Sequence, residues 1–313
     1  MFKNSIPIFY IYCIIVGISV RPRVFSFVPV YIQRTQKVKM SATTTTNGAT
    51  TAKPTKFMGV CHWIDWKSAA VSALPDPTRV FSFLVMAIML GRYAESHDWD
   101  ASLLLTGFFL NPYVVVFLSI AVAVLRVSNS NSNAKLPPLP VYDRWAVEWY
   151  WWNAWFYHAV MDGASGSFQL VPVVVQQYQV LDKRFTTHHS VPWTVGAIEL
   201  FIMQPLCLAC VYCILQRHPY RFPLELITST FQVMGMILFI VAEVFEGQLN
   251  VPALDPVGIP GNRWANVKLD LYHFTYYWFG FWFCNLIWGV VPYYRIVRAV
   301  QECAHALGAQ KSK

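Results

Sequence analysis

The chain has 313 residues, of which 56% are hydrophobic and only 13% are charged, and its mean hydropathy is positive. This composition is typical of an integral membrane protein and excludes an ordinary soluble domain. The net charge of +8 arises in residues 1–64, which hold eight basic residues and no acidic one, while the remaining 16 basic residues balance the 16 acidic ones. No basic, aromatic-rich surface remains for nucleic acid, so no nucleic-acid partner is expected.

Residues 1–64 predict a targeting or disordered extension. An apolar run at 6–20 follows Lys3, as in a signal peptide, a signal anchor or the start of an organelle presequence. Residues 41–56 are rich in threonine and lack acidic side chains, so we expect them to be disordered. Met40, just before this tract, is an alternative translation start.

Residues 65–101 predict an amphipathic or interfacial segment. Their apolar run at 80–90 is too short to cross a bilayer, so we expect it to lie at the interface or pack against a bundle. Residues 102–300 then predict an all-α, polytopic membrane bundle of about five transmembrane helices, and 301–313 a cytosolic basic tail. The expected spans are 102–125 with a kink at Asn111-Pro112, 144–163, 192–215 capped by Ser190, 222–244, and 271–291.

The span at 144–163 is almost wholly apolar, yet it carries His158 and Asp162 one helical turn apart. Such groups are costly in hydrocarbon, so they indicate a functional site that faces protein. On an α-helix both point the same way, and Trp155 and Glu148, which precede Asp162 at intervals of seven residues, share roughly the same stripe.

Polar groups also interrupt two later spans. Glu199 is the only charge within 192–215, and Asn285 stands three residues before Trp288, on one predicted face with Trp278. Two carboxyl groups and an imidazole in a dry pocket can move protons, and an aromatic ring can stabilise a cation. The alternatives are a buried network that holds helices together and a water-filled transport path. No metal site is expected, because the three cysteines of the same span lack a fourth ligand: Cys207, Cys210 and Cys213.

Five segments in order resemble the emopamil-binding protein family, the sterol Δ8–Δ7 isomerases with an EXPERA-type membrane domain. The resemblance covers roughly residues 102–300. The matching segments are His158-Ala-Val-Met-Asp162-Gly163, Gln177-Tyr178 with Asp182-Lys183-Arg184-Phe185, Arg217-His218-Pro219-Tyr220-Arg221-Phe222, Gln232-Val-Met-Gly235 with Glu243, and Asn285-Leu-Ile-Trp288 with Pro292.

The resemblance implies a five-span bundle in the endoplasmic reticulum membrane and an enzyme without a cofactor. It implies that His158 and Asp162 take part in proton transfer, with Glu199 as a further catalytic candidate. It also implies that Asn285 and Trp288 line a sterol pocket, to which we add Trp155 and Trp278 as substrate-binding candidates. The expected ligands are a sterol from the bilayer and cationic amines; a homodimer is left open.

Two departures from the family pattern bear on catalysis. Asp162 stands where the family has glutamate, and ungapped counting places Gly196 at the family's third-helix glutamate and Glu199 at its threonine. Because residues 196 and 199 lie about one helical turn apart, we expect the displaced Glu199 and the shorter Asp162 to compensate.

The sequence thus predicts a sterol isomerase that moves the ring double bond from Δ8 to Δ7 through a carbocation. The alternative is a non-catalytic sterol- or lipid-binding protein of the same superfamily. It also predicts a multi-pass protein of the endoplasmic reticulum, or of a plastid-associated membrane if residues 1–56 are a presequence. The sequence assigns neither the exact sterol nor the acid and the base.

Overall fold

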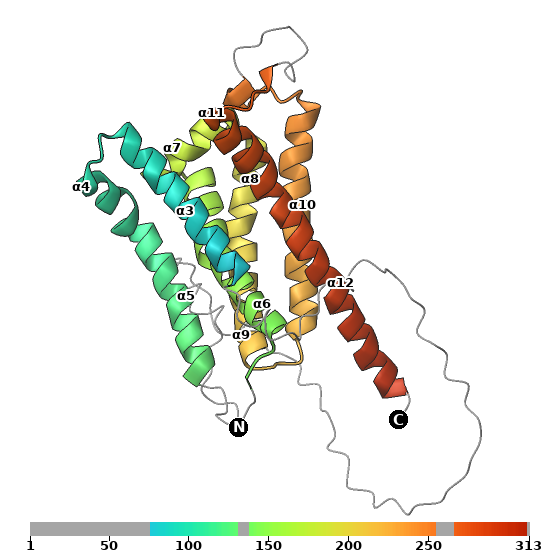
Figure 1. Ribbon diagram of the computed structural model, residues 1–313. Coiled ribbons are helices and arrows are strands. Elements are labelled where there is room, and N and C mark those ends of the chain that lie inside the picture. Colours follow the sequence, from blue (N-terminus) through green and yellow to red (C-terminus); the bar gives the residue numbers. More distant parts are fainter. Residues whose placement is uncertain (1–75, 131–137, 255–265, 312–313) are drawn as a thin grey trace, which may run out of the picture. The chain divides into compact units, whose positions relative to one another are not determined.

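The computed structural model describes residues 76–130, 138–254 and 266–311, all of which belong to one compact unit, Trp66–Lys313 (Figure 1). The expectations for residues 1–64, including the Met40 start, and for the first part of 65–101 lie outside these residues. Within the described residues the chain is helical and forms no strand, which confirms the all-α prediction.

The helices run in alternating directions along one another (Figure 1). Several of them change from α-helical to wider π-helical turns without a break. In chain order the elements are α3 (Pro77–Ser96), α4 (Ala101–Leu104) with η1 (Leu105–Phe109), α5 (Pro112–Ser130), α6 (Val141–Trp152) with η2 (Asn153–Ser167), α7 (Pro172–Leu181), η3 (Lys183–Phe185), α8 (Ser190–Ile198) with η4 (Glu199–Met203) and α9 (Gln204–Leu215), α10 (Arg221–Phe245), η5 (Pro252–Leu254), and α11 (Leu271–His273) with η7 (Phe274–Phe283) and α12 (Cys284–Lys311).

Among the described residues, two helical segments are long and apolar enough to cross a membrane, Ser190–Leu215 and Arg221–Phe245. The bent pair Ala101–Phe109 and Pro112–Ser128 counts as a third if it forms one span, and its 51° bend agrees with the kink predicted at Asn111-Pro112. The chain is therefore an α-helical membrane protein. The other two predicted spans stay predictions, because they are rich in Trp and Tyr, whose polar atoms reduce their hydropathy.

The helix boundaries correct the sequence analysis at Ser190 and add to it at two other places. The run at 80–90 is the middle of α3, which begins at Pro77 after its N-cap Asp76, whose carboxylate accepts from the backbone N–H of Thr78 at 2.9 Å. Because Pro77 and this cap extend the helix beyond the apolar run, α3 is 20 residues long and packs against α6 and α7. Ser190 is the first residue of α8, and His189 occupies the cap position. Residues 172–181, for which no helix was predicted, form α7.

Three π-helical segments surround the interior of the bundle. The longest, η2, contains His158 and Asp162; η4 begins at Glu199; and η7 directly precedes Asn285 on α12. A π-helix bonds residue i to i+5, so its backbone carbonyls are partly free for other donors, as when the Ser165 hydroxyl donates to Val160 O at 2.6 Å. Such local widening is tolerated in a membrane where these groups find partners within the protein.

Glycine lets α8 approach η2 closely. A Cβ atom added to Gly196 would lie 2.3 Å from the carbonyl oxygen of Asp162 and 2.4 Å from the hydroxyl of Ser167. On the facing helix, a Cβ on Gly163 would lie 2.6 Å from Cβ of Leu200. Small residues of this kind allow the backbones of membrane helices to touch. This contact determines how far Glu199 projects toward η2.

We predict that Gly196→Ala lowers the midpoint of thermal unfolding in detergent, because the new methyl group meets backbone rather than a flexible side chain. Overpacking of this kind costs typically about 1–3 kcal/mol. Gly91→Ala on α3 is the control, since nothing lies within 4 Å of the added Cβ and alanine is the better helix former. Equal unfolding midpoints for the two variants would contradict the close approach.

Candidate active site

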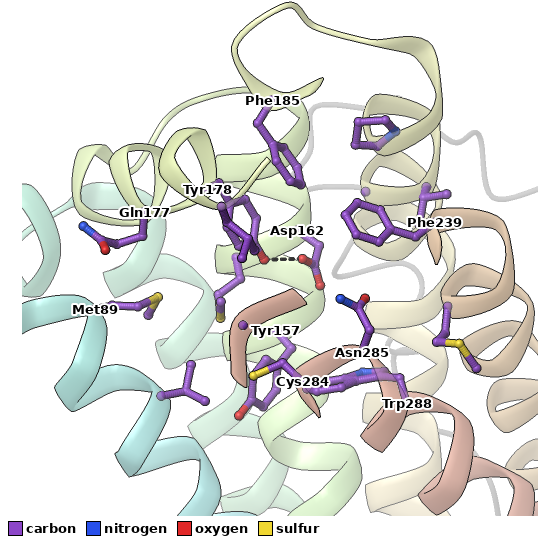
Figure 2. Close-up of a pocket in the computed structure, with 18 of the residues that line it drawn as sticks. Met89, Tyr157, Asp162, Gln177, Tyr178, Phe185, Phe239, Cys284, Asn285 and Trp288 are labelled. Atoms are coloured by element: carbon purple, nitrogen blue, oxygen red, sulfur yellow. Dashed lines mark hydrogen bonds between the residues drawn. The ribbon is translucent and has the colours of Figure 1, made fainter. Parts of the chain in front are cut away.

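An apolar cavity lies between α3, η2, α7, α8, α10 and the η7–α12 helix (Figure 2). Its wall is mostly aliphatic and aromatic. Carboxyl, amide and hydroxyl groups interrupt this wall, among them those of Asp162, Gln177, Glu199, Gln232, Thr275 and Asn285. An apolar chamber with a few convergent polar groups is the usual form of a small-molecule site.

Two carboxyl groups from different helices meet in this cavity. Asp162 and Glu199 both line it, and His158 lies beside them, so that one ligand-type atom from each of the three residues falls within 4.8 Å of the others. His158 is fully buried and does not itself line the cavity. Its Nδ1 atom lies 3.6 Å from Oε2 of Glu199. The three predicted catalytic residues are therefore brought together, with the carboxyl groups on the substrate side and the imidazole behind them.

Tyr178 of α7 holds Asp162 in place. Its hydroxyl donates a short hydrogen bond to Oδ1 of Asp162 (Figure 2), and its ring stacks on Phe185 at 4.4 Å between centroids. Since an apolar interior offers no water to a carboxyl group, such a fixed donor lowers the cost of burying Asp162.

Trp288 and Asn285 line the cavity on the α12 side, as predicted. The indole N–H of Trp288 donates to Oδ1 of Asn153 at 2.9 Å, and its ring meets Tyr157 edge to face at 4.6 Å. The amide of Asn285 donates to the carbonyl of Phe281 at 2.5 Å. With its polar edge already bonded, Trp288 can present its ring to a ligand.

Trp155 and Trp278, the other two substrate-binding candidates, do not line the cavity. Trp155 is buried among Trp151, Trp152 and Phe156 on another side of the helix. Trp278 is 38% exposed, and its indole N–H lies 3.4 Å from the carbonyl of Lys268. The sequence analysis assigned both residues to the cavity face by assuming α-helical spacing. This assumption is wrong here, because each residue lies in a π-helix, which has more residues per turn.

The sequence analysis gave no role at the site to the side chains that hold His158 and Asp162. Gln232 and Tyr178 appear there only within segments that resemble the family, and Trp149 is not named. Gln232 bonds His158, Trp149 bonds Gln232, and Tyr178 bonds Asp162. A signal was present for Gln232, because an amide inside the apolar span 222–244 needs a partner. The contacts themselves could not be predicted, because each joins residues that lie far apart in the sequence.

The His158, Asp162 and Glu199 set has donor types that divalent metals accept, one imidazole and two carboxylates. The expectation of no metal and no cofactor stays a prediction.

Residues 170–299 match the EBP family model, described as EXPERA (expanded EBP superfamily). These residues include Glu199, Asn285 and Trp288. Over these residues the chain is similar to the EBP family. Curated relatives are the 3-beta-hydroxysteroid-Delta(8),Delta(7)-isomerases of Mus musculus, 25% identical over 191 residues (58% of this chain and 75% of the mouse protein), and of Cavia porcellus, 24% identical over 207 residues (64% and 82%). The Rattus norvegicus isomerase is 23% identical over 184 residues (56% and 72%).

Within residues 170–299, position 196 has no room for a longer side chain. Its Cα faces the backbone of Asp162, so the close contact of α8 with η2 depends on glycine there. Glu199, one turn later, points instead into the cavity beside Gly235, where an added Cβ would lie 3.5 Å from its Oε1 atom. The third-helix carboxyl group of this chain is therefore supplied from position 199.

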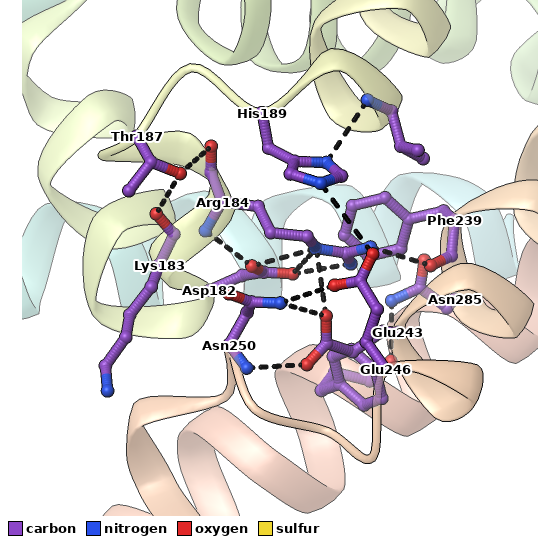
Figure 3. A network of polar contacts seen from close by, with 12 residues as sticks. Asp182, Lys183, Arg184, Thr187, His189, Phe239, Glu243, Glu246, Asn250 and Asn285 are labelled. Atoms are coloured by element: carbon purple, nitrogen blue, oxygen red, sulfur yellow. Dashed lines mark hydrogen bonds and ion pairs between the residues drawn. The ribbon is translucent and has the colours of Figure 1, made fainter.

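A buried ionic cluster lies around Arg184 (Figure 3). Arg184 donates to Oδ2 of Asp182 at 2.7 Å and pairs with Oε2 of Glu243 at 3.1 Å, and all three side chains are fully buried. The side chain of Asn250 donates to Oε2 of Glu243 at 2.9 Å. The cluster joins η3 to α10, and it fixes Phe185, which lines the cavity.

We predict that Arg184→Met strongly destabilises the fold, because Asp182 and Glu243 would remain as buried charges without a cation. Removing one partner from such a cluster costs about 3–5 kcal/mol. Thermal unfolding in detergent measures this loss. The neighbouring exposed side chain provides the control, and Lys183→Met should unfold within about 0.5 kcal/mol of wild type. A small effect of Arg184→Met would mean that the two carboxyl groups are not charged together.

Proposed function

We propose that this protein is a membrane sterol isomerase that moves the ring double bond from Δ8 to Δ7. One observation carries the proposal: Asp162 and Glu199 lie side by side in a cavity whose wall is mostly apolar. The names of the relatives and the similarity to the EBP family support the sterol as substrate. Its apolar body suits the wall of the cavity, and we expect it to enter from the bilayer of the endoplasmic reticulum.

The reaction needs one proton to be added and another to be removed. A protonated carboxyl group donates its proton to one carbon of the Δ8 double bond, and a cation forms at the other carbon. The second, ionised carboxyl group then takes the proton from C7, and the electrons of that C–H bond form the Δ7 double bond. The carboxyl oxygens of Asp162 and Glu199 lie within 4.8 Å of each other, a gap that one bridging water spans, so a proton can pass between them and restore the starting state.

Trp288 and the ionised carboxyl group stabilise the cation in this scheme. An indole face attracts a cation, and the attraction is strongest where water is excluded. Asn285 lies one turn before Trp288 on α12 and offers an amide to a polar group of the substrate. No cofactor is required for the proton transfers, since the double bond changes position without a net gain or loss of electrons.

We predict that Asp162→Asn and Glu199→Gln each lower the rate of Δ7-sterol formation by ~10²–10⁴-fold, because each removes one proton-carrying group. Expression of the chain in cells that lack the isomerase, followed by sterol analysis, measures this rate. Glu95→Gln, which changes an exposed carboxylate paired with Arg92, should leave the rate unchanged.

Two outcomes of that experiment would contradict the proposal. Wild-type rates in either cavity variant would remove that carboxyl group from the chemistry. Sterol binding by the wild-type chain without any Δ7 product would instead indicate a non-catalytic sterol-binding protein.

For cationic amines, which would mimic the carbocation, we predict that Trp288→Leu weakens binding more than Trp288→Phe does. The difference should be on the order of 1–2 kcal/mol, because phenylalanine keeps a π face and leucine does not. Competition against a radiolabelled amine measures both affinities. Equal affinities would show that Trp288 contributes apolar contact and no cation–π attraction.

A further inference from the structure

A chain of three buried side chains leads to the back of the carboxyl pair. The indole N–H of Trp149 on α6 donates to Oε1 of Gln232 on α10 at 3.2 Å. Nε2 of the same glutamine lies 3.1 Å from Nε2 of His158 on η2. Trp149 is 3% exposed, Gln232 is 1% exposed and His158 is not exposed at all, so water does not compete for these bonds.

The chemistry of Trp149 orients the amide of Gln232. An indole nitrogen can only donate a hydrogen bond, so the oxygen of the amide must face Trp149. The NH₂ group therefore faces His158, and it also can only donate. The ring nitrogen that receives this bond, Nε2, must then carry a lone pair and no proton. A neutral imidazole holds one proton, which is left on Nδ1.

Nδ1 of His158 faces the carboxyl pair. It lies 3.6 Å from Oε2 of Glu199, and among the described residues neither of these two atoms has a hydrogen-bond partner at normal length. Gln232 also lines the cavity, so the amide stands between the substrate chamber and the imidazole.

We propose that Gln232, oriented by Trp149, is a positioning residue that fixes His158 as the Nδ1–H tautomer, so that the imidazole presents an N–H group, and not a lone pair, toward Glu199. The tautomer follows from the contacts alone, whereas its importance for turnover rests on the proposed isomerase function. In this arrangement His158 does not act as a base toward the cavity, and the proton traffic stays between Asp162 and Glu199. The same proton occupies the lone pair with which Nδ1 would bind a metal ion, so His158 is not a metal ligand in this tautomer.

The first test observes the tautomer directly. The full chain, with ¹⁵N-labelled histidine, is placed in lipid bilayers, and the ring nitrogens of His158 are assigned by the signals lost in His158→Gln. We expect a protonated Nδ1 and an unprotonated Nε2 in the wild type. A wild-type spectrum with the proton on Nε2 overturns the inference, whether or not the protein turns over a sterol.

The second test changes the amide while keeping its size. In Gln232→Glu a carboxylate accepts from Trp149 and from His158, so the proton should appear on Nε2. In Gln232→Met no donor remains, and both tautomers should be populated. Ser229→Ala is the matched control, because Ser229 is a buried residue of α10 that pairs with Tyr150 of α6 at 2.9 Å and does not bond His158. It should keep the wild-type spectrum.

The third test connects the tautomer to turnover. If the wild type forms Δ7-sterol, Gln232→Glu and Gln232→Met should lower kcat roughly ten- to hundred-fold with little change in KM, because the lost bond positions a reacting group and not the substrate. An unchanged kcat together with an altered spectrum would overturn the positioning role. A wild-type protein that shows the expected tautomer but no isomerase activity would refute the proposed function and leave the assignment of the tautomer intact.

Discussion

The close contact of α8 with η2 is the constraint on which the rest of the site depends. Gly196 allows the backbone of α8 to touch the carbonyl of Asp162, and Gly163 makes room for Leu200 in return. Any side chain at position 196 would separate the two helices. The contact brings Glu199, one turn further along, to the side of His158 and Asp162. These two close contacts thus set the position of Glu199 relative to Asp162.

Buried charges hold the bundle at both ends of this contact. Near the η3–α10 end, Arg184 lies between Asp182 and Glu243 (Figure 3). A second cluster lies where α6, α10 and α12 meet, and its bonds include Arg221 to Asp143 at 2.9 Å and Arg295 to Glu225 at 3.0 Å. A buried ion pair adds little net stability, but breaking one is costly, so these clusters select one arrangement of the helices.

Between the clusters, bonds to other parts of the bundle orient several of the polar groups that the structure describes. Tyr178 donates to Asp162, Asn153 accepts from Trp288, and Gln232 bonds both Trp149 and His158. An interior of low polarity strengthens such bonds and makes an unmatched group expensive. Catalytic groups held in this way need no reorganisation when charge develops in a substrate, which suits a reaction through a carbocation.

The chain combines two departures from the EBP family pattern, one at Asp162, before the matched residues 170–299, and one at Glu199, within them. The shorter Asp162 and the glutamate at 199 lie at one cavity wall, while position 196 is used for helix packing. The expectation that the two departures compensate therefore has a geometric basis. Segments outside residues 170–299 also contribute to the cavity, since α3 supplies Phe81, Val85 and Met89 to its wall.

The sequence by itself determined that this is an all-α membrane protein, because long apolar segments and their flanking charges depend on composition alone. It also identified His158, Asp162, Glu199, Asn285 and Trp288, since polar groups are rare and conspicuous inside apolar helices. It misplaced Trp155 and Trp278, because α-helical spacing does not hold where the chain forms π-helices. Only the tertiary structure showed that His158 lies behind the two carboxyl groups and that Trp149, Gln232 and Tyr178 hold them. Those contacts join helices far apart in the chain, and no local pattern specifies which buried donor will meet which acceptor.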